Sequence, residues 1–206
     1  PSTFSMASSA ASFPVSVPYL ECISMKILVP LAEGFEEIEA VAIIDVLRRA
    51  GLSTTSASLA GNPVRGSHAI PVTADEPLDG LQPGDFGAIV LPGGMPGSDN
   101  LRKSDTVISY IQSIHRRGGI TAALCAAPMV LGHAGVLAGK KATCFPGFEG
   151  MMTGATPTGA PVEVDGTVIT ARGPGCAIPF ALALVEALAG KTIMKELRSA
   201  MQVYWL

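Results

Sequence analysis

Several residue types are scarce in this chain of 206 residues, and each scarcity argues against a class of protein. Charged residues make up 15%, the net charge is -3, and Lys and Arg form no cluster, so no electrostatic footprint for nucleic acid or an anionic membrane is present. We therefore expect small-molecule or protein partners. The four cysteines are far apart, and no C-x-x-C pair offers a zinc or dithiol redox motif. We expect free thiols in a reducing, cytoplasmic compartment, with no metal and no cofactor; the cysteines are Cys22, Cys125, Cys144 and Cys176.

One stretch, from Ile120 to Ala138, contains no Asp, Glu, Lys or Arg and is long enough to suggest a membrane span. Its β-branched opening, together with Pro128 and His133, favours a buried strand followed by a buried helix instead.

Short apolar runs alternate with amphipathic stretches from Lys26 onward, and 48% of the residues are hydrophobic. This alternation predicts one α/β domain over residues 25–206, with a mostly parallel sheet and helices on both faces. We expect strands at Ile27–Leu31, Leu52–Leu59, Ala88–Leu91, Ile120–Leu124, Ala142–Phe145 and Val168–Ala171, and the clearest helices at Glu36–Ala50, Ser104–Arg117, Cys176–Ala189 and Thr192–Val203.

The first 24 residues differ from the rest because they are rich in Ser, Ala and Pro and contain one acid, Glu21. We interpret residues 1–24 as an appendage to the domain. An organellar transit peptide would be Ser-rich and poor in acids but would normally carry Arg, so a tag remnant or an upstream extension explains the segment equally well.

The strongest local feature is an apolar strand that runs into Cys125 and then into a helix of small residues. This is the layout of a nucleophile elbow, in which the side chain stands out at the carboxyl edge of the sheet. The helix N-terminus offers amide donors and a positive dipole, which would lower the pKa of the thiol. A buried core cysteine is the competing interpretation, and the local sequence leaves the two about even.

A second feature is Glu39, which shares the apolar side of its helix with Ala42, Ile43, Val46 and Ala50. A carboxyl that faces the core has a raised pKa and, beside a thiolate, would stay protonated and donate a hydrogen bond or shuttle a proton. Pairing with the helix dipole is the alternative. Glu36 and Glu37 already occupy that role, which favours a partner in the core for Glu39.

A third feature is the Leu91-Pro-Gly-Gly94 turn directly after a predicted strand. Two glycines let the backbone approach a ligand, so the amides of Gly94 and Ala126 could together form an oxyanion hole. A plain tight turn is the alternative interpretation.

Four stretches in this order resemble the signatures of the ThiJ/PfpI superfamily: Gly34-Phe-Glu-Glu-Ile-Glu39, Leu91-Pro-Gly-Gly94, Ala123-Leu-Cys-Ala-Ala-Pro128 and Arg172-Gly-Pro-Gly175. The resemblance extends from Met25 to nearly the end of the chain and is closest to the branch of the parkinsonism-associated protein and the bacterial protein YajL. It implies a flavodoxin-like three-layer sandwich, a homodimer, and an oxidation-sensitive cysteine hydrogen-bonded to a protonated Glu.

The resemblance also assigns roles to individual residues of this chain. Cys125 matches the nucleophile, Glu39 its carboxyl partner, and Gly94 and Ala126 the amides around the sulfur. Two arginines, Arg48 and Arg172, match arginines near the dimer interface and the pocket. The full set of remaining pocket positions is Gly93, Phe145, Arg48, Arg172 and Pro174.

The chain departs from its relatives in its histidines. Protease-like and amidotransferase-like branches place a His after the nucleophile, where Ala126 stands here, and Phe145 stands where the parkinsonism-associated protein has a His. Of the three histidines, His115 falls on an expected surface helix and His133 lies about two turns beyond Cys125, which leaves both badly placed as a base. A Cys-His-Asp triad is therefore unsupported; the third histidine is His68.

The resemblance, together with an activated Cys125, implies two functions. The first, which the branch of the parkinsonism-associated protein implies, is a cofactor-independent enzyme of the glyoxalase III or deglycase type, acting on methylglyoxal and glyoxal or on their protein adducts. The second is an oxidative-stress sensor or redox-regulated chaperone that uses oxidation of the same thiol. An inert α/β domain is the third interpretation, and it requires that Cys125 reacts no faster than Cys144.

Overall fold

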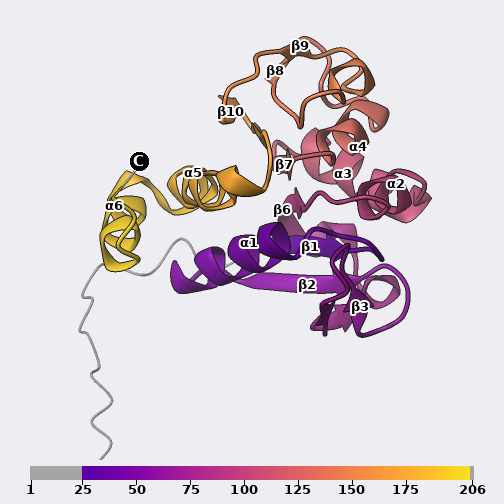
Figure 1. The fold of residues 1–206 in the computed structure, drawn as a ribbon, viewed down its shortest axis with the longest axis horizontal. Coiled ribbons are helices and arrows are strands. Elements are labelled where there is room, and N and C mark those ends of the chain that lie inside the picture. The colour runs from indigo at the N-terminus through magenta and orange to yellow at the C-terminus, as the bar shows by residue number, and fades with distance from the viewer. Residues whose placement is uncertain (1–24, 205–206) are drawn as a thin grey trace, which may run out of the picture.

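A seven-stranded sheet forms the middle layer of the computed structural model, which describes residues 25–204 (Figure 1). All neighbouring strands of this sheet are parallel except the edge pair β10–β11, which is antiparallel. In spatial order the strands are β10 Val162–Asp165, β11 Val168–Ala171, β7 Ile120–Leu124, β6 Phe86–Leu91, β1 Lys26–Leu31, β2 Thr54–Ser58 and β5 Glu76–Pro77.

Helices cover both faces of the sheet and enclose two apolar cores (Figure 1). Successive side chains of β1 point to opposite faces of the sheet, which explains why there are two cores. Ile27 and Val29 pack with α1 and α5, while Leu28 packs with α3 and α4. This is the predicted α/β sandwich. The helices are α1 Glu37–Arg49, α2 Gly97–Arg102, α3 Asp105–Arg116, α4 Pro128–His133, α5 Ala177–Ala189 and α6 Lys191–Ala200.

Most predicted elements lie within a few residues of the observed ones, but the strand expected at Ala142–Phe145 is wrong. Only Lys141–Ala142 (β8) is extended, and it pairs with β9 (Thr156–Pro157) in a separate two-stranded sheet. The central sheet has no free edge here, because β11 already pairs with β10 and β7. The Thr143 amide instead donates to the Thr170 hydroxyl at 2.9 Å.

The elements that the sequence analysis missed are short or carry weak patterns. They are the two edge strands β5 and β10, the strand β9, the helix α2, and a small hairpin of β3 (Val64–Arg65) and β4 (Pro71–Val72). Within residues 25–204, no helix is both long and apolar enough to cross a membrane. The expected appendage at residues 1–24, which includes Cys22, lies outside the described residues and stays a prediction.

Candidate active site

Cys125 occupies the sharp turn between strand β7 and helix α4. Its backbone φ is +61°, a left-handed conformation that costs energy for a residue with a side chain and is typical of a nucleophile elbow. The turn is held on both sides, since the Cys125 amide donates to the carbonyl of Ala171 at 2.9 Å and its carbonyl accepts from the Phe145 amide at 2.8 Å. Only 9% of Cys125 is exposed.

Glu39 lies on the first turns of α1 and is completely buried. Its Oε2 accepts a hydrogen bond of 2.7 Å from the amide of Gly93, which follows β6. Burial, opposed by this amide and by the Cys125 thiol, raises the pKa of the carboxyl to about 7. The other oxygen, Oε1, is buried and has no aligned hydrogen-bond partner among the described residues.

Gly93 brings these two side chains together because it has none of its own. A Cβ placed there would lie 2.6 Å from Cys125 Cβ and 2.7 Å from Glu39 Oε2, closer than real Cβ atoms come to their neighbours. Gly94 has a φ of +89°, and its amide, like that of Ala126, reaches the sulfur and favours the thiolate. Both amides therefore point at the Cys125 sulfur, and their role as an oxyanion hole stays a prediction.

The pKa of Cys125 is not lowered, contrary to the expectation from the sequence. The pKa of the thiol is raised to about 12, first by burial and then by the charge of the Glu39 carboxylate, and these outweigh the amides of Gly94 and Ala126. Glu39 and Cys125 shift each other, so the pair titrates as a unit that holds one proton over a wide pH range. Transfer of the thiol proton to Glu39 would give the thiolate that a nucleophile needs.

The other pocket positions predicted from the sequence lie in two places. Phe145 is 44% exposed, and its ring lies against Gly173, ahead of Pro174. Arg172 is exposed, donates to the Gly159 carbonyl at 3.2 Å, and lowers the pKa of the Cys144 thiol, which burial raises to about 11.

Arg48, by contrast, lies near the far end of α1, nine residues beyond Glu39. Its guanidinium binds the Asp75 carboxylate and the carbonyl of Thr54 at 3.1 Å. The structure therefore does not bring Arg48 to Cys125.

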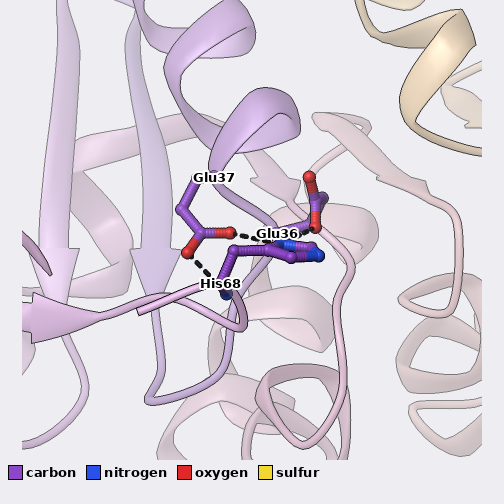
Figure 2. A group of neighbouring side chains, drawn as sticks. All are labelled: Glu36, Glu37 and His68. Carbon is purple, nitrogen blue, oxygen red and sulfur yellow. Dashed lines mark hydrogen bonds and ion pairs between the residues drawn. The ribbon is translucent and has the colours of Figure 1, made fainter. Parts of the chain in front are cut away.

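The sequence analysis missed a group of polar side chains at the start of α1. Glu36 and Glu37 lie at the N-terminus of α1, as expected for acids that meet the helix dipole. They also contact Ser67 and His68 on the β3–β4 hairpin, and Figure 2 shows both acids with His68. Neighbouring acids and a lone His were visible in the sequence, but nothing local indicated that segments 31 residues apart would meet.

Comparisons with known proteins agree with this architecture. The model of the DJ-1/PfpI family matches residues 25–187. The chain is 39% identical over 194 residues to protein DJ-1 homolog B of Arabidopsis thaliana, covering 93% of this chain but 44% of the relative, so it spans less than half of that protein's length. It is 34% identical over 169 residues to glutathione-independent glyoxalase DJR-1.2 of Caenorhabditis elegans, covering 81% of this chain and 89% of the relative.

A solved structure extends the likeness to three dimensions. Oxidized DJ-1 of Toxoplasma gondii superposes with a TM-score of 0.82 at 37% identity, covering 88% of this chain and 100% of that one. The flavodoxin-like fold is thus shared with DJ-1 proteins. This chain belongs to the DJ-1/PfpI family, in the branch of the DJ-1 proteins.

Proposed function

We propose that this protein is a cofactor-independent glyoxalase of the glyoxalase III type that converts methylglyoxal to lactate and glyoxal to glycolate, and also acts on their adducts with proteins. The observation that carries the proposal is the pairing of Cys125, on its strained turn, with the buried carboxyl of Glu39. A carboxyl with a pKa near 7 can both accept and return a proton at neutral pH. The relative from Caenorhabditis elegans that is named a glyoxalase supports the same class of reaction.

In the first step, the Glu39 carboxylate takes the proton of the Cys125 thiol as the sulfur attacks the aldehyde carbon. The carbonyl electron pair moves to oxygen, and the amides of Gly94 and Ala126 stabilise the resulting alkoxide. Glu39 then returns its proton to that oxygen, which completes a neutral hemithioacetal.

In the second step, the Glu39 carboxylate removes the proton from the carbon that carries the sulfur and delivers it to the neighbouring carbon, while the hydroxyl proton of the hemithioacetal passes to the oxygen of that neighbouring carbon. The first carbon is oxidised to a thioester while the second is reduced to an alcohol, so no external oxidant or reductant is needed. Water then cleaves the thioester, releasing lactate and restoring the thiol.

The test is methylglyoxal consumption and lactate formation without glutathione by the wild type, Cys125→Ala, Glu39→Gln and Cys144→Ala. Cys144 is a matched control because it is another buried thiol with a raised pKa. We expect Cys125→Ala to fall to the uncatalysed rate and Cys144→Ala to keep the wild-type rate. Equal rates in all four proteins would rule out the mechanism.

A second function is favoured by the free Oε1 of Glu39. Two equivalents of peroxide would convert the Cys125 thiol to a sulfinate and release two waters, and a protonated Glu39 could donate to a sulfinate oxygen. The amides of Gly94 and Ala126 would bind the other. The protein would then report oxidative stress through its partners, as a sensor or chaperone.

Mass spectrometry after mild peroxide treatment tests this second function. We expect two oxygens to be added at Cys125 before Cys144 or Cys176, and less of this product in Glu39→Ala. A sensor without glyoxalase activity would show this selectivity together with negligible turnover of methylglyoxal. Equal oxidation of the three thiols would contradict sensing.

We also propose that the protein is a homodimer in which the outer face of α1 meets its copy. Ile38 and Val41 are three residues apart on α1 and are 62% and 50% exposed, so they present an apolar strip. Sedimentation should show a dimer for the wild type and a monomer for Val41→Glu. Val164→Glu, at an equally exposed apolar position on β10, should stay dimeric. The cytoplasmic location stays a prediction.

A further inference from the structure

The group at the start of α1 combines Glu36, Glu37 and His68 (Figure 2) with the hydroxyl of Ser67, from two separate segments. Glu37 is the first residue of α1 and Glu36 directly precedes it, while Ser67 and His68 come from the turn of the β3–β4 hairpin. The Nδ1 of His68 lies 3.0 Å from Glu37 Oε2, 3.2 Å from Glu36 Oε2 and 3.1 Å from Ser67 Oγ. Ser67 Oγ in turn lies 3.2 Å and 3.3 Å from the same two carboxylate oxygens.

These distances are those between the ligands of a small metal ion. Five of the six distances among these four atoms are 3.0–3.3 Å, and the ligand atoms of Glu36, Glu37 and His68 all lie within 4.8 Å of one another. A regular tetrahedron with edges of about 3.1 Å has its centre about 1.9 Å from each corner, close to the Zn–N and Zn–O distances of about 2.0–2.2 Å. One imidazole nitrogen and two carboxylates are also a set of protein ligands used by zinc. A hydroxyl or a water can complete the coordination.

Burial and charge favour a cation at the same point. Glu36 and Glu37 are each only 6% exposed, so two neighbouring carboxylates are withdrawn from water and need a positive partner. The only cationic side chain that contacts them among the described residues is His68, whose side chain is 70% exposed at the outer end of the group. An ion could therefore enter from solvent with little movement of the chain.

The carboxylate of Glu37 is also held in place from behind. Its Oε1 accepts hydrogen bonds from the amides of His68 at 2.7 Å and Ile70 at 3.3 Å. Its Oε2 is therefore left to face the other atoms of the group, His68 Nδ1 and Ser67 Oγ. Gly66 leaves the space that this carboxyl fills, because a Cβ there would collide with it. Such outer contacts orient a ligand before the metal arrives.

We propose that Glu36, Glu37 and His68, with Ser67 or a water, form a binding site for one divalent ion of the zinc class. The proposal concerns binding and is independent of the glyoxalase reaction. The site nevertheless adjoins the reactive pair, since the Glu36 amide donates to the carbonyl of Gly93 at 2.9 Å. The sequence analysis expected no metal because the cysteines form no C-x-x-C pair. Ligands from the start of α1 and a distant hairpin have no recognisable spacing in the sequence.

Calorimetric titration of the metal-free full chain with Zn²⁺ tests the proposal, alongside the absorption spectrum of the Co²⁺ form. We expect one ion per chain and a cobalt spectrum without thiolate charge transfer. His68→Ala and Glu37→Gln should each weaken binding at least about tenfold. The exposed side chain of His68 and the isosteric change at Glu37 leave the fold intact, which circular dichroism would verify.

Two control variants distinguish this site from other sources of affinity. His133→Ala removes another exposed histidine, and Cys125→Ala removes the reactive thiol; both should bind Zn²⁺ as the wild type does. Binding that survives His68→Ala but is lost in Cys125→Ala would place the metal on the thiol and overturn the proposal. Absence of saturable Zn²⁺ binding to the wild type would also overturn the proposal. The group would then be only an ion pair between His68 and the two carboxylates.

Discussion

Glu37 and Glu39 stand two residues apart on the same helix, and both are buried, yet their pKa values move in opposite directions. Burial pushes the pKa of each carboxyl upward and is the largest influence on both. The pKa of Glu37 nevertheless falls to about 2, whereas that of Glu39 rises to about 7. Burial alone therefore does not decide the charge of a carboxyl.

The difference lies in the groups that each carboxyl meets. Glu37 faces the hairpin, where the amides of His68 and Ile70 and the His68 imidazole all stabilise its charge. Glu39 faces the core, where one amide and a thiol are its partners, and the negative charge of Glu36 raises its pKa further. One turn of helix thus presents an anion to the hairpin and a proton carrier to the sulfur.

The largest expected effect is that of Glu39→Gln on turnover and on thiol reactivity, which should change in opposite directions. Turnover of methylglyoxal should fall by about 10²–10⁴-fold because the general acid–base group is lost. The pKa of the Cys125 thiol should fall, because the carboxylate charge that raises it is gone. Rates of alkylation at Cys125 against pH, read by mass spectrometry, measure the second effect.

Glu37→Gln is the matched control for that experiment, since it changes a buried carboxyl on the same turn of helix. It should leave turnover within a few-fold of the wild type in the presence of a chelator. If Glu37→Gln reduced turnover as strongly as Glu39→Gln, the division of roles between the two carboxyls would be wrong.

The next effect is on stability, and the two carboxyls should act in opposite pH windows. Glu37 has a folded pKa below its ordinary value of 4.5, so its stabilising contribution is present above that value and is lost as the pH falls toward 2. Glu39 has a folded pKa above 4.5, so the folded chain holds a proton that the unfolded chain releases. The contribution of Glu39 to the free energy of unfolding is present below pH 4.5 and is lost as the pH rises through 7. The loss amounts to about 3 kcal/mol at most.

Urea unfolding of the wild type and the two Gln variants, at one protein concentration and with a chelator, measures these windows. As the pH rises from about 5 to about 8, the free energy of unfolding of Glu39→Gln should fall less than that of the wild type. Glu37→Gln should lose less than the wild type on acidification below about pH 4.5. Parallel pH curves for all three proteins would contradict the opposite shifts.

A smaller effect is expected from Gly93→Ala, which tests how closely the Cys125–Glu39 pair is packed. The added methyl would press on both side chains, so we expect a loss of about 1–3 kcal/mol in stability and reduced turnover. Gly84→Ala is the control, because a Cβ there has no neighbour within 4 Å. Chemical unfolding and turnover that are unchanged in Gly93→Ala would show that the pair is free to separate.

The elements around Cys125 could be predicted because their patterns are local. An apolar run that ends in Cys125 predicts β7 and the elbow, and a 3.6-residue apolar period predicts α1 with Glu39 inward. The Glu39–Gly93 hydrogen bond was beyond such reasoning, since it joins residues 54 positions apart. The raised thiol pKa was also unpredictable, because the sequence shows which amides follow Cys125 but not how completely it is desolvated.

The smallest effect is expected at Arg48, where the resemblance to relatives and the structure differ. The resemblance suggests a pocket residue, but here the guanidinium pairs with Asp75 at the other end of α1 from Glu37, and both side chains are more than 40% exposed. An exposed ion pair contributes about 1 kcal/mol or less. Arg48→Ala should therefore lower stability by no more than that and leave turnover unchanged, as kinetics and urea unfolding would show. If turnover fell in Arg48→Ala while sedimentation still showed a dimer, the reactive region would extend along α1 well beyond the Cys125–Glu39 pair.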